Sequence, residues 1–278
     1  MPNTLADLTP IITASALNGV GNSLAFLGDF TTDFSDSLTD ARRSTVNVPL
    51  ITGSTAVINP TAFGGGSNGS TLIPVAMQHV SVPFYISSAE YQNGYKLEQL
   101  ITSNVQILAN KIQELAFAPL ISTNFGNAVV VAEASFALAS LQTAWASVKG
   151  LRKICYLSGT AFSKLLTNQL TVQDPTLGLP YGGFAKVAYA DVLTGVGANV
   201  YGFVSTDKKG LVMASAIPDI APKAKEMIDT TLIDLGNGLT AALNVWGSTS
   251  DRSDNASLDI YFNAAKGSAD GIKLIKSA

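Results

Sequence analysis

The sequence predicts an α+β fold, in which extended segments form sheets and a long helix packs against them. Two early segments, 44–52 and 72–86, have the composition of strands. Residues 95–117 repeat apolar side chains with the period of a helix. Residues 239–262 alternate apolar and polar positions on both sides of a polar turn, which is typical of a β-hairpin.

The first 43 residues contain a stretch with helical spacing. Apolar side chains recur there at steps of three and four residues, at Leu24, Leu27, Phe30, Phe34 and Leu38. Acidic side chains recur similarly, at Asp29, Asp33, Asp36 and Asp40. Calcium loops need closely grouped oxygen ligands and a turn that contains glycine, so a solvated helix face is the preferred interpretation of these acids. We therefore expect an arm with one amphipathic helix.

The glycine run "TAFGGGSNGST" (61–71) lies between the two strand-like segments. Pro74 and Pro83 disfavour a central strand for 72–86, because proline has no amide proton to donate. Residues 44–86 therefore form a long excursion of two extended arms. Because an isolated two-stranded ribbon is marginal in water, we expect it to lie on other protein.

The helical period begins after residue 87. The residues "SSAE" (87–90) have the spacing of a capping box, and Pro119 ends the helix predicted at 95–117. One continuous apolar face runs along this helix, formed by Leu97, Leu100, Ile101, Val105, Leu108, Ile112 and Leu115.

The remaining chain mixes short helices and strands. We expect helices at 133–148, 160–170 and 219–229, strands at 153–157 and 197–205, a loop rich in glycine and proline at 174–183, the hairpin, and a last strand at 271–278.

Charge is scarce and unevenly distributed. Charged residues make up 13% of the 278 residues, and the 52 residues between Arg43 and Lys96 contain one formal charge, Glu90. The cores of protein interfaces are depleted of charge in this way. The net charge of −3 argues against a dedicated nucleic-acid binder, although a shell that encloses nucleic acid stays open.

The sequence offers no catalytic constellation, metal site or cofactor site. Its one cysteine, Cys155, and one histidine, His79, exclude an internal disulfide and a Cys/His zinc site. Gly65, Ser67 and Gly69 match G-x-S-x-G, but that motif needs a following helix, and the segment after it is extended. Neither a membrane span nor a signal peptide is visible, so we expect a soluble protein made in a cytoplasm.

The order of these parts resembles that of a known family. An amphipathic arm and an uncharged extended loop are followed by "ISSAEYQNGYKLEQLITSNVQILANKIQELAF", an Ala-rich helix and "LRKICYLSGTAFSKLLTNQL", and the chain closes with a hairpin and a strand. This pattern is similar to that of the major capsid proteins of tailed bacteriophages, whose fold also occurs in encapsulin shells.

The resemblance implies four regions. They are an N-terminal arm (1–43), an extended loop (44–86), a peripheral domain with a long spine helix (87–131 and 236–278) and an axial domain (132–235). The tip of the extended loop would take part in assembly through Gly64, Gly65, Gly66, Ser67, Asn68 and Gly69, because glycines adopt positive φ at little steric cost.

The resemblance also implies a function. The chain would be the major subunit of an icosahedral virion shell, assembled in the host cytoplasm from hexamers and pentamers around double-stranded DNA. Its partners would be a separate scaffolding protein and a portal, with no membrane and no enzymatic activity. The alternatives are an encapsulin-like compartment that holds cargo enzymes and, from another class, a serine hydrolase that uses Ser67.

One prediction follows from the lysine positions. Where members of that family cross-link covalently, a lysine of the extended loop joins an asparagine of a neighbour, but residues 44–95 contain no lysine. Boiled assemblies should therefore run as a single band near 28.9 kDa in denaturing electrophoresis. A ladder of covalent oligomers would contradict this and point to another lysine, with Lys96 the first to replace.

Overall fold

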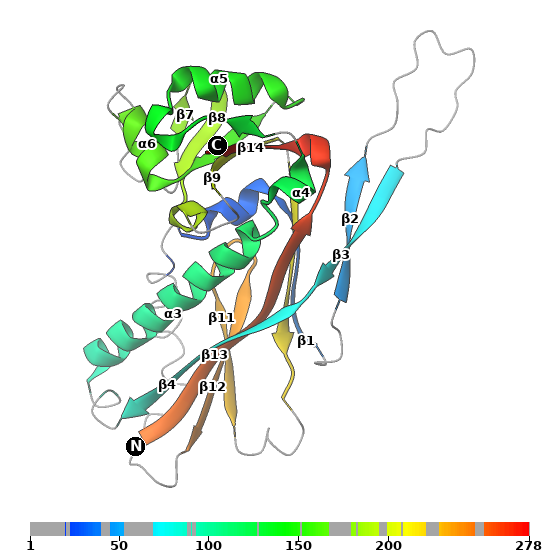
Figure 1. The fold of residues 1–278 in the computed structure, drawn as a ribbon. Helices are drawn as coiled ribbons and strands as arrows, with labels where there is room; N and C mark the ends of the chain where they lie inside the picture. The colour runs from blue at the N-terminus through cyan, green and yellow to red at the C-terminus, as the bar shows by residue number, and fades with distance from the viewer. Residues whose placement is uncertain are drawn as a thin grey trace.

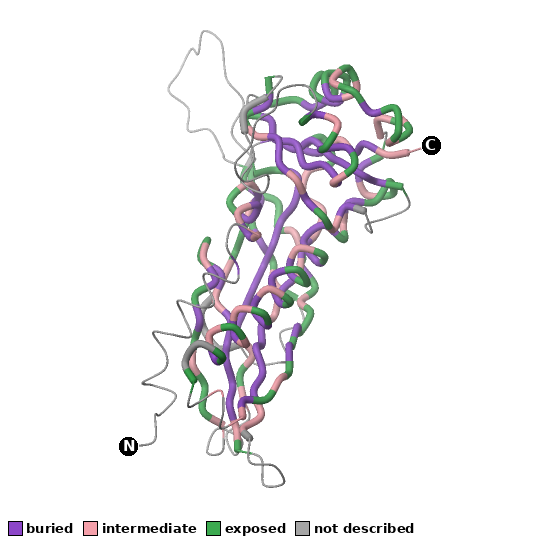
Figure 2. The backbone as a smooth tube through the Cα atoms, turned by 90° about the vertical axis from the view of Figure 1, so that its left-hand side faces the viewer, coloured by how far each residue is buried: buried purple, intermediate pink, exposed green. Residues whose placement is uncertain are grey.

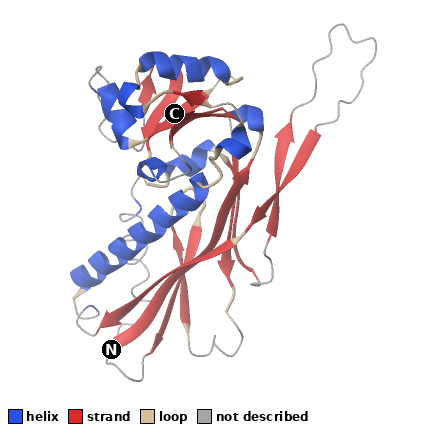
Figure 3. Cartoon of the chain, in the orientation of Figure 1, coloured by secondary structure: helices blue, strands red, loops and turns tan. Residues whose placement is uncertain are grey.

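The computed structural model describes residues 20, 23–39, 45–52, 69–87, 90, 93–126, 128–150, 152–166, 179–181, 183–194, 199–206, 208–220, 228–247 and 253–277. It has two six-stranded sheets and a separate two-stranded ribbon (Figures 1 and 3). The helical elements are η1 Ala25–Asp29, α3 Gly94–Phe117, α4 Ser122–Phe125, η2 Glu133–Ser135, α5 Leu138–Ser147, α6 Gly159–Leu166, η3 Asp191–Thr194 and η4 Ala269–Gly271. The strands are β1 Thr31–Thr39, β2 Thr45–Thr52, β3 Gly69–Ala76, β4 Gln78–Ser87, β5 Val129–Val130, β6 Lys153–Leu157, β7 Leu179–Tyr181, β8 Phe184–Tyr189, β9 Val200–Thr206, β10 Leu211–Pro218, β11 Asp229–Asp234, β12 Thr240–Gly247, β13 Ser253–Lys266 and β14 Ile272–Lys276. The predicted α+β class is confirmed.

The first sheet is organised by its longest strand, β13. Strand β4 pairs along one edge of β13, and β12 and β10 pair in tandem along its other edge. The sheet ends in β11 beyond β12 and in β1 beyond β10, and β1 is parallel to β10 while the other pairings are antiparallel. The predicted hairpin of β12 and β13 is confirmed.

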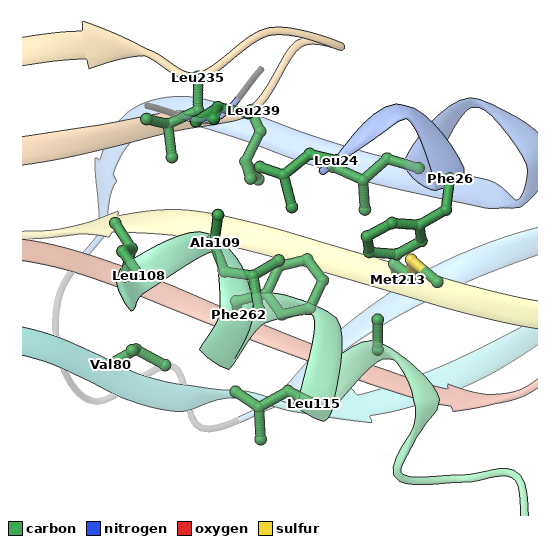
Figure 4. Close-up of a cluster of buried hydrophobic side chains, with 14 of the residues drawn as sticks. Leu24, Phe26, Val80, Leu108, Ala109, Leu115, Met213, Leu235, Leu239 and Phe262 are labelled. Carbon is green, nitrogen blue, oxygen red and sulfur yellow. The ribbon is translucent and has the colours of Figure 1, made fainter. Parts of the chain in front are cut away.

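Helix α3 covers one face of the first sheet. The predicted stripe faces inward, since Ile101, Val105, Leu108 and Ile112 have no exposed surface. Figure 4 shows Leu108, Ala109 and Leu115 pointing towards Phe262 of β13 and Val80 of β4. Asn93 caps the helix by accepting a hydrogen bond from the Lys96 amide at 3.4 Å. The Ser87 amide donates to the Glu90 carboxylate at 2.8 Å, which is one of the two contacts of the predicted capping box.

The second sheet has the order β5-β14-β9-β6-β8-β7. Helices α5 and α6 cover one face of it, over Cys155, Leu157 and Val204. Strands β6, β9 and β14 and helix α6 were predicted, with residues 167–170 of that helix outside the described residues. The helix expected at 133–148 is interrupted, because Phe136 adopts an extended conformation and buries its ring against Tyr201 at a centroid distance of 5.7 Å.

An aromatic cluster joins the two sheets. It consists of Phe26 and Phe30 near the N-terminus, Phe117 at the end of α3, Tyr156 of β6 and Phe203 of β9. Ring centroids of Tyr156 and Phe203 lie 5.4 Å apart, those of Phe117 and Phe203 also 5.4 Å apart, and those of Phe26 and Phe117 5.0 Å apart. Figure 2 shows buried residues, in purple, in both the first sheet and the second.

A buried ion pair lies beside this aromatic cluster. Lys186 Nζ donates to Asp29 Oδ2 at 2.7 Å and to the Tyr156 hydroxyl oxygen at 2.9 Å, and the Tyr156 hydroxyl donates to the same carboxylate. Burial and then the nearby Asp29 charge raise the pKa of Tyr156 well above its usual value, so the phenol stays protonated. The N-terminal segment is thereby tied to the second sheet.

The prediction of a helix across residues 24–38 is wrong. Only a 3-10 turn forms, and the chain then becomes strand β1, which pairs with β10. Its apolar spacing belongs to two elements, because Leu24, Leu27 and Phe30 are buried around the turn while Phe34 lies on the strand. Asp29 pairs with Lys186 and is therefore not part of a solvated helix face.

Two further expectations need correction. Strands β8, β10 and β11 were not predicted, and β7 lies inside the expected loop 174–183. Of the helix expected at 219–229, residues 221–227 lie outside the described residues and Asp229 begins a strand.

The α3 face predicts a matched pair of variants. Leu108→Asp should prevent folding or lower the free energy of unfolding by more than about 4 kcal/mol, because the carboxylate would be buried without a partner. Ile107→Asp is the control, since the neighbouring Ile107 is 53% exposed. Soluble yield, circular dichroism and urea unfolding measure both. A folded Leu108→Asp with the wild-type unfolding midpoint would contradict the assignment of this face.

Candidate assembly surface

Strands β2 and β3 form a ribbon that lies on the first sheet. They pair in antiparallel register from Thr45 opposite Ala76 to Thr52 opposite Gly69. The ribbon's inner face packs on the sheet through Val48 and Val75, which contact a cluster with Val212 and Ala214 of β10. Since Leu211 and Met213 of β10 point into the core beneath α3, the ribbon covers the opposite face of the sheet.

The opposite side of this ribbon is exposed and uncharged. We call it the outer ribbon face, and its members are Thr45, Asn47, Pro49, Ile51, Ser70, Leu72, Pro74 and Ala76. Its most exposed large side chains are Ile51, at 68%, and Leu72, at 61%. Exposed apolar side chains grouped on one face are typical of a protein contact.

The ribbon also has unpaired edges. Among the described residues, β2 and β3 pair only with each other, so each has one edge without a partner strand, although the Ala76 carbonyl at the end of β3 accepts a hydrogen bond from Asn263 Nδ2 at 2.6 Å. Natural proteins protect such edges with charged side chains or with proline; neither strand contains a charge, and each contains one proline, Pro49 in β2 and Pro74 in β3. The ribbon is therefore a surface on which another chain can pair or pack.

The predicted tip of the extended loop joins these two strands. Gly64, Gly65, Gly66, Ser67 and Asn68 lie outside the described residues, and Gly69 is the first residue of β3. The second half of segment 72–86 does not belong to this excursion, because β4 pairs with β13 in the first sheet.

The structure argues against the alternative of a serine nucleophile at Ser67, because a strand and not a helix follows the motif. The G-x-S-x-G motif works on a turn from a strand into a helix, whereas Gly69 begins strand β3. His79, the one candidate base, sits on β4, where its Nε2 donates to Asp259 Oδ1 at 3.0 Å and its ring lies 5.2 Å from that of Tyr261. No group of three or more metal-binding side chains occurs in the part of the chain that the structure describes.

Asp259 is the centre of a polar cluster that the sequence did not reveal. It is buried on β13, on the face of the sheet opposite α3, and its Oδ2 accepts hydrogen bonds from Asn244 Nδ2 at 2.8 Å and from the Ser257 hydroxyl. Burial alone would raise the pKa of Asp259, but hydrogen bonds from His79, Ser257, Ser81 and Asn244 outweigh it and lower the pKa to about 2. The partner His79 lies 180 positions away in the sequence, so no local pattern could indicate the pair.

The buried thiol of Cys155 has no role in this surface. It lies beneath α5 and α6, as expected of a small apolar side chain, and burial raises its pKa so that it remains a neutral thiol.

Of the helices the structure describes, none is long and apolar enough to cross a membrane.

Among known proteins, similarity to this chain was found in solved structures and not in sequences. No protein-family model matches the sequence, and no curated protein matches it. A chain of the virus-like particle from Pyrococcus furiosus is similar with a TM-score of 0.58 at 10% identity, covering 97% of this chain and 100% of that chain. The chain has the capsid shell fold.

Two further structures with the capsid shell fold agree. A chain of the satellite phage P4 procapsid, which includes the size determination protein, gives a TM-score of 0.55 at 9% identity and covers 96% of this chain and 91% of that chain. A chain of the cyanophage P-SCSP1u capsid gives 0.51 at 12% identity and covers 90% and 86%. The resemblance seen in the sequence is confirmed at the level of fold.

The Asp259 cluster predicts acid sensitivity in this capsid shell fold. Because the folded-state pKa lies below the ordinary value of 3.8, the cluster stabilises the subunit fully above about pH 4 and loses its effect as the pH falls towards 2. Asp259→Asn should remove this part of the pH dependence, on the order of 1 kcal/mol after solvent screening. Urea unfolding midpoints between pH 5 and 2.5 measure it. The control is Asp33→Asn, which is exposed on β1; equal pH profiles for Asp259→Asn and the control would refute the prediction.

Proposed function

We propose that the chain is the major structural subunit of a closed icosahedral shell, without enzymatic activity. The observation that carries this proposal is the likeness of fold over almost the whole chain to shell chains of a virus-like particle, a procapsid and a phage capsid. The shell would be the capsid of a tailed phage, built from hexamers and pentamers and enclosing double-stranded DNA. Assembly would take place in the host cytoplasm, with a scaffolding protein and a portal as partners.

The outer ribbon face supports self-association. An exposed Ile51 and Leu72 on an uncharged ribbon gain free energy when another subunit removes them from water, at about 25 cal/mol for each Å² of apolar area. The same surface offers no charge that would have to be paired on burial. We assign this ribbon to the extended loop, with the tip at Gly64, Gly65, Gly66, Ser67, Asn68 and Gly69 in contact with a neighbouring subunit.

The two sheets support a division into two domains. We assign the first sheet and α3, as the spine helix, to the peripheral domain, and the second sheet with α5 and α6 to the axial domain. Strand pairing favours a boundary drawn by sheets, because β14 pairs in the second sheet while β1, β10 and β11 pair in the first. This boundary differs from the limits expected from the sequence, which were 1–43, 87–131, 132–235 and 236–278. Strand β1 of the expected arm and strands β10 and β11 of the expected axial domain lie in the first sheet, whereas β5 and β14 of the expected peripheral domain lie in the second.

A compartment that holds protein cargo is the second candidate. It rests on the similarity of fold to the virus-like particle from Pyrococcus furiosus, at a TM-score of 0.58. Purified shells distinguish the two: nuclease-protected double-stranded DNA supports the phage capsid, and copurifying protein without DNA supports the compartment.

The outer ribbon face gives the test of assembly. Ile51→Asp combined with Leu72→Asp should leave the subunit folded but lower the yield of closed shells at least about tenfold, because each charge would be buried without a partner at a contact. Circular dichroism measures folding, and negative-stain electron microscopy with light scattering measures shells. Replacing the same two residues by threonine is the matched control, which keeps the ribbon uncharged. A wild-type protein that stays monomeric at micromolar concentration would overturn the proposal.

The loop tip is tested in the same assay. Shortening residues 63–68 keeps the Thr52–Gly69 pair of the ribbon, so the subunit should fold while shell yield falls. Ser67→Ala should change nothing, because it removes one hydroxyl and no backbone freedom. Full shell yield from the shortened chain would show that the tip has no part in assembly, and loss of an esterase activity in Ser67→Ala would favour the hydrolase.

A further inference from the structure

A cavity opens where the chain passes from the first sheet to the second. Strand β13 ends at Lys266, η4 follows, and β14 begins at Ile272. The cavity has a volume of about 450 Å³ and lies among η4, α4 and the end of α5. Its charged lining consists of Lys149, Lys266, Lys273 and Asp270.

The lining carries an excess of positive charge. Three ammonium groups face one carboxylate, and none of the three lysines forms an ion pair with Asp270 or with any other acid among the described residues. Lys266 and Lys273 are only partly exposed, so part of their hydration is already lost. Lys266 Nζ lies 5.9 Å from the centre of the Phe125 ring, which also lines the cavity.

Three lysines elsewhere in the described chain show the kinds of partner that a lysine can have. Lys111 pairs with Glu114 at 2.7 Å on the surface of α3, and Lys186 pairs with the buried Asp29 at 2.7 Å. Lys153 donates to the carbonyl oxygen of Trp145 at 2.6 Å. The cavity thus has three lysines and one carboxylate in its lining, which leaves two positive charges without a counter-charge there.

The backbone on one side of the cavity is held firmly. The Gly267 amide donates to the Gly210 carbonyl at 2.9 Å, and the Ser268 amide donates to the Lys209 carbonyl at 2.7 Å. A Cβ on Gly267 would lie 2.3 Å from the Lys209 carbonyl oxygen, and one on Gly271 would lie 3.1 Å from the Gly210 amide nitrogen. Because only glycine permits this close approach, the turn between Lys266 and Lys273 is fixed before any ligand arrives.

We propose that this cavity binds a phosphate group through Lys149, Lys266 and Lys273. Each ammonium offers three donors, and a phosphate offers several anionic acceptors at a size that the cavity admits. Asp270 opposes the anion and limits its affinity. The inference rests on the lining of the cavity and does not depend on the shell proposed above.

The phosphate has two possible sources, a free phosphate or the backbone of a nucleic acid. A second hollow of about 510 Å³ shares Lys273 and Ser147 with the cavity and continues along β5 and α5. A ligand longer than one phosphate therefore has room to extend beyond the lysines.

Binding to the purified full chain tests the proposal. Isothermal titration with inorganic phosphate and pyrophosphate measures the free anions, and fluorescence anisotropy with a labelled DNA duplex at 50 and 200 mM salt measures the backbone. Lys266→Gln combined with Lys273→Gln should weaken binding at least about tenfold, since charge-assisted hydrogen bonds are lost. Asp270→Asn should tighten binding about threefold, because a like charge is removed. Lys111→Gln is the control, a surface lysine on α3 that should bind as the wild type does.

The outcomes distinguish a free phosphate from a nucleic-acid backbone, and they test the phosphate site separately from the proposed shell. Competition between phosphate and the duplex for the lysines assigns the site to a nucleic-acid backbone, whereas binding of the free anions alone assigns it to a small phosphate. Equal affinity in the double variant, the control and the wild type would overturn the proposal. If the double variant does not fold, a failure of Asp270→Asn to tighten binding overturns it instead. Electron microscopy of the same samples reports shell formation independently.

Discussion

The aromatic cluster between the sheets is the contact on which the arrangement of this subunit depends. Phe30, Phe117, Tyr156 and Phe203 come from the N-terminal segment, the end of α3 and two strands of the second sheet. Each ring pair contributes about 0.5–1.5 kcal/mol beyond the apolar area that it buries. The Asp29–Lys186 pair closes the side of the cluster with directional bonds. Together they hold two sheets, each with its own helices, as one body.

Within that body, strand β13 separates two kinds of surface. Its residues Leu258, Ile260 and Phe262 point into the core beneath α3, while Ser257 and Asp259 point to the opposite face. The helical face is dry and closed within the subunit. The opposite face holds the polar cluster and carries the ribbon, whose outer face is exposed. One strand thus contributes to the core beneath α3 and to the polar cluster on the opposite face of the sheet.

The sequence predicted best what depends on local spacing. The long apolar stripe of α3 and the alternation in β12 and β13 each extend over many residues, so their periods are visible without knowledge of the fold. Strand β1 was missed because its partner β10 lies far along the chain, and pairing there overrides the helical spacing that Phe34 and Leu38 continue. The Asp259 cluster and the lysine cavity were missed for the same reason. Their members come from strands and turns that only the folded chain brings together.

The position of β13 in the chain has a consequence for synthesis. This strand pairs with β4, β10 and β12, and all of them are translated before it. The first sheet therefore has no central strand until β13 has been synthesised. Pairing between strands that lie far apart in the sequence, such as β4 and β13, is also slow. The ribbon packs on β10, and β10 gains its antiparallel partner only when β13 has emerged from the ribosome.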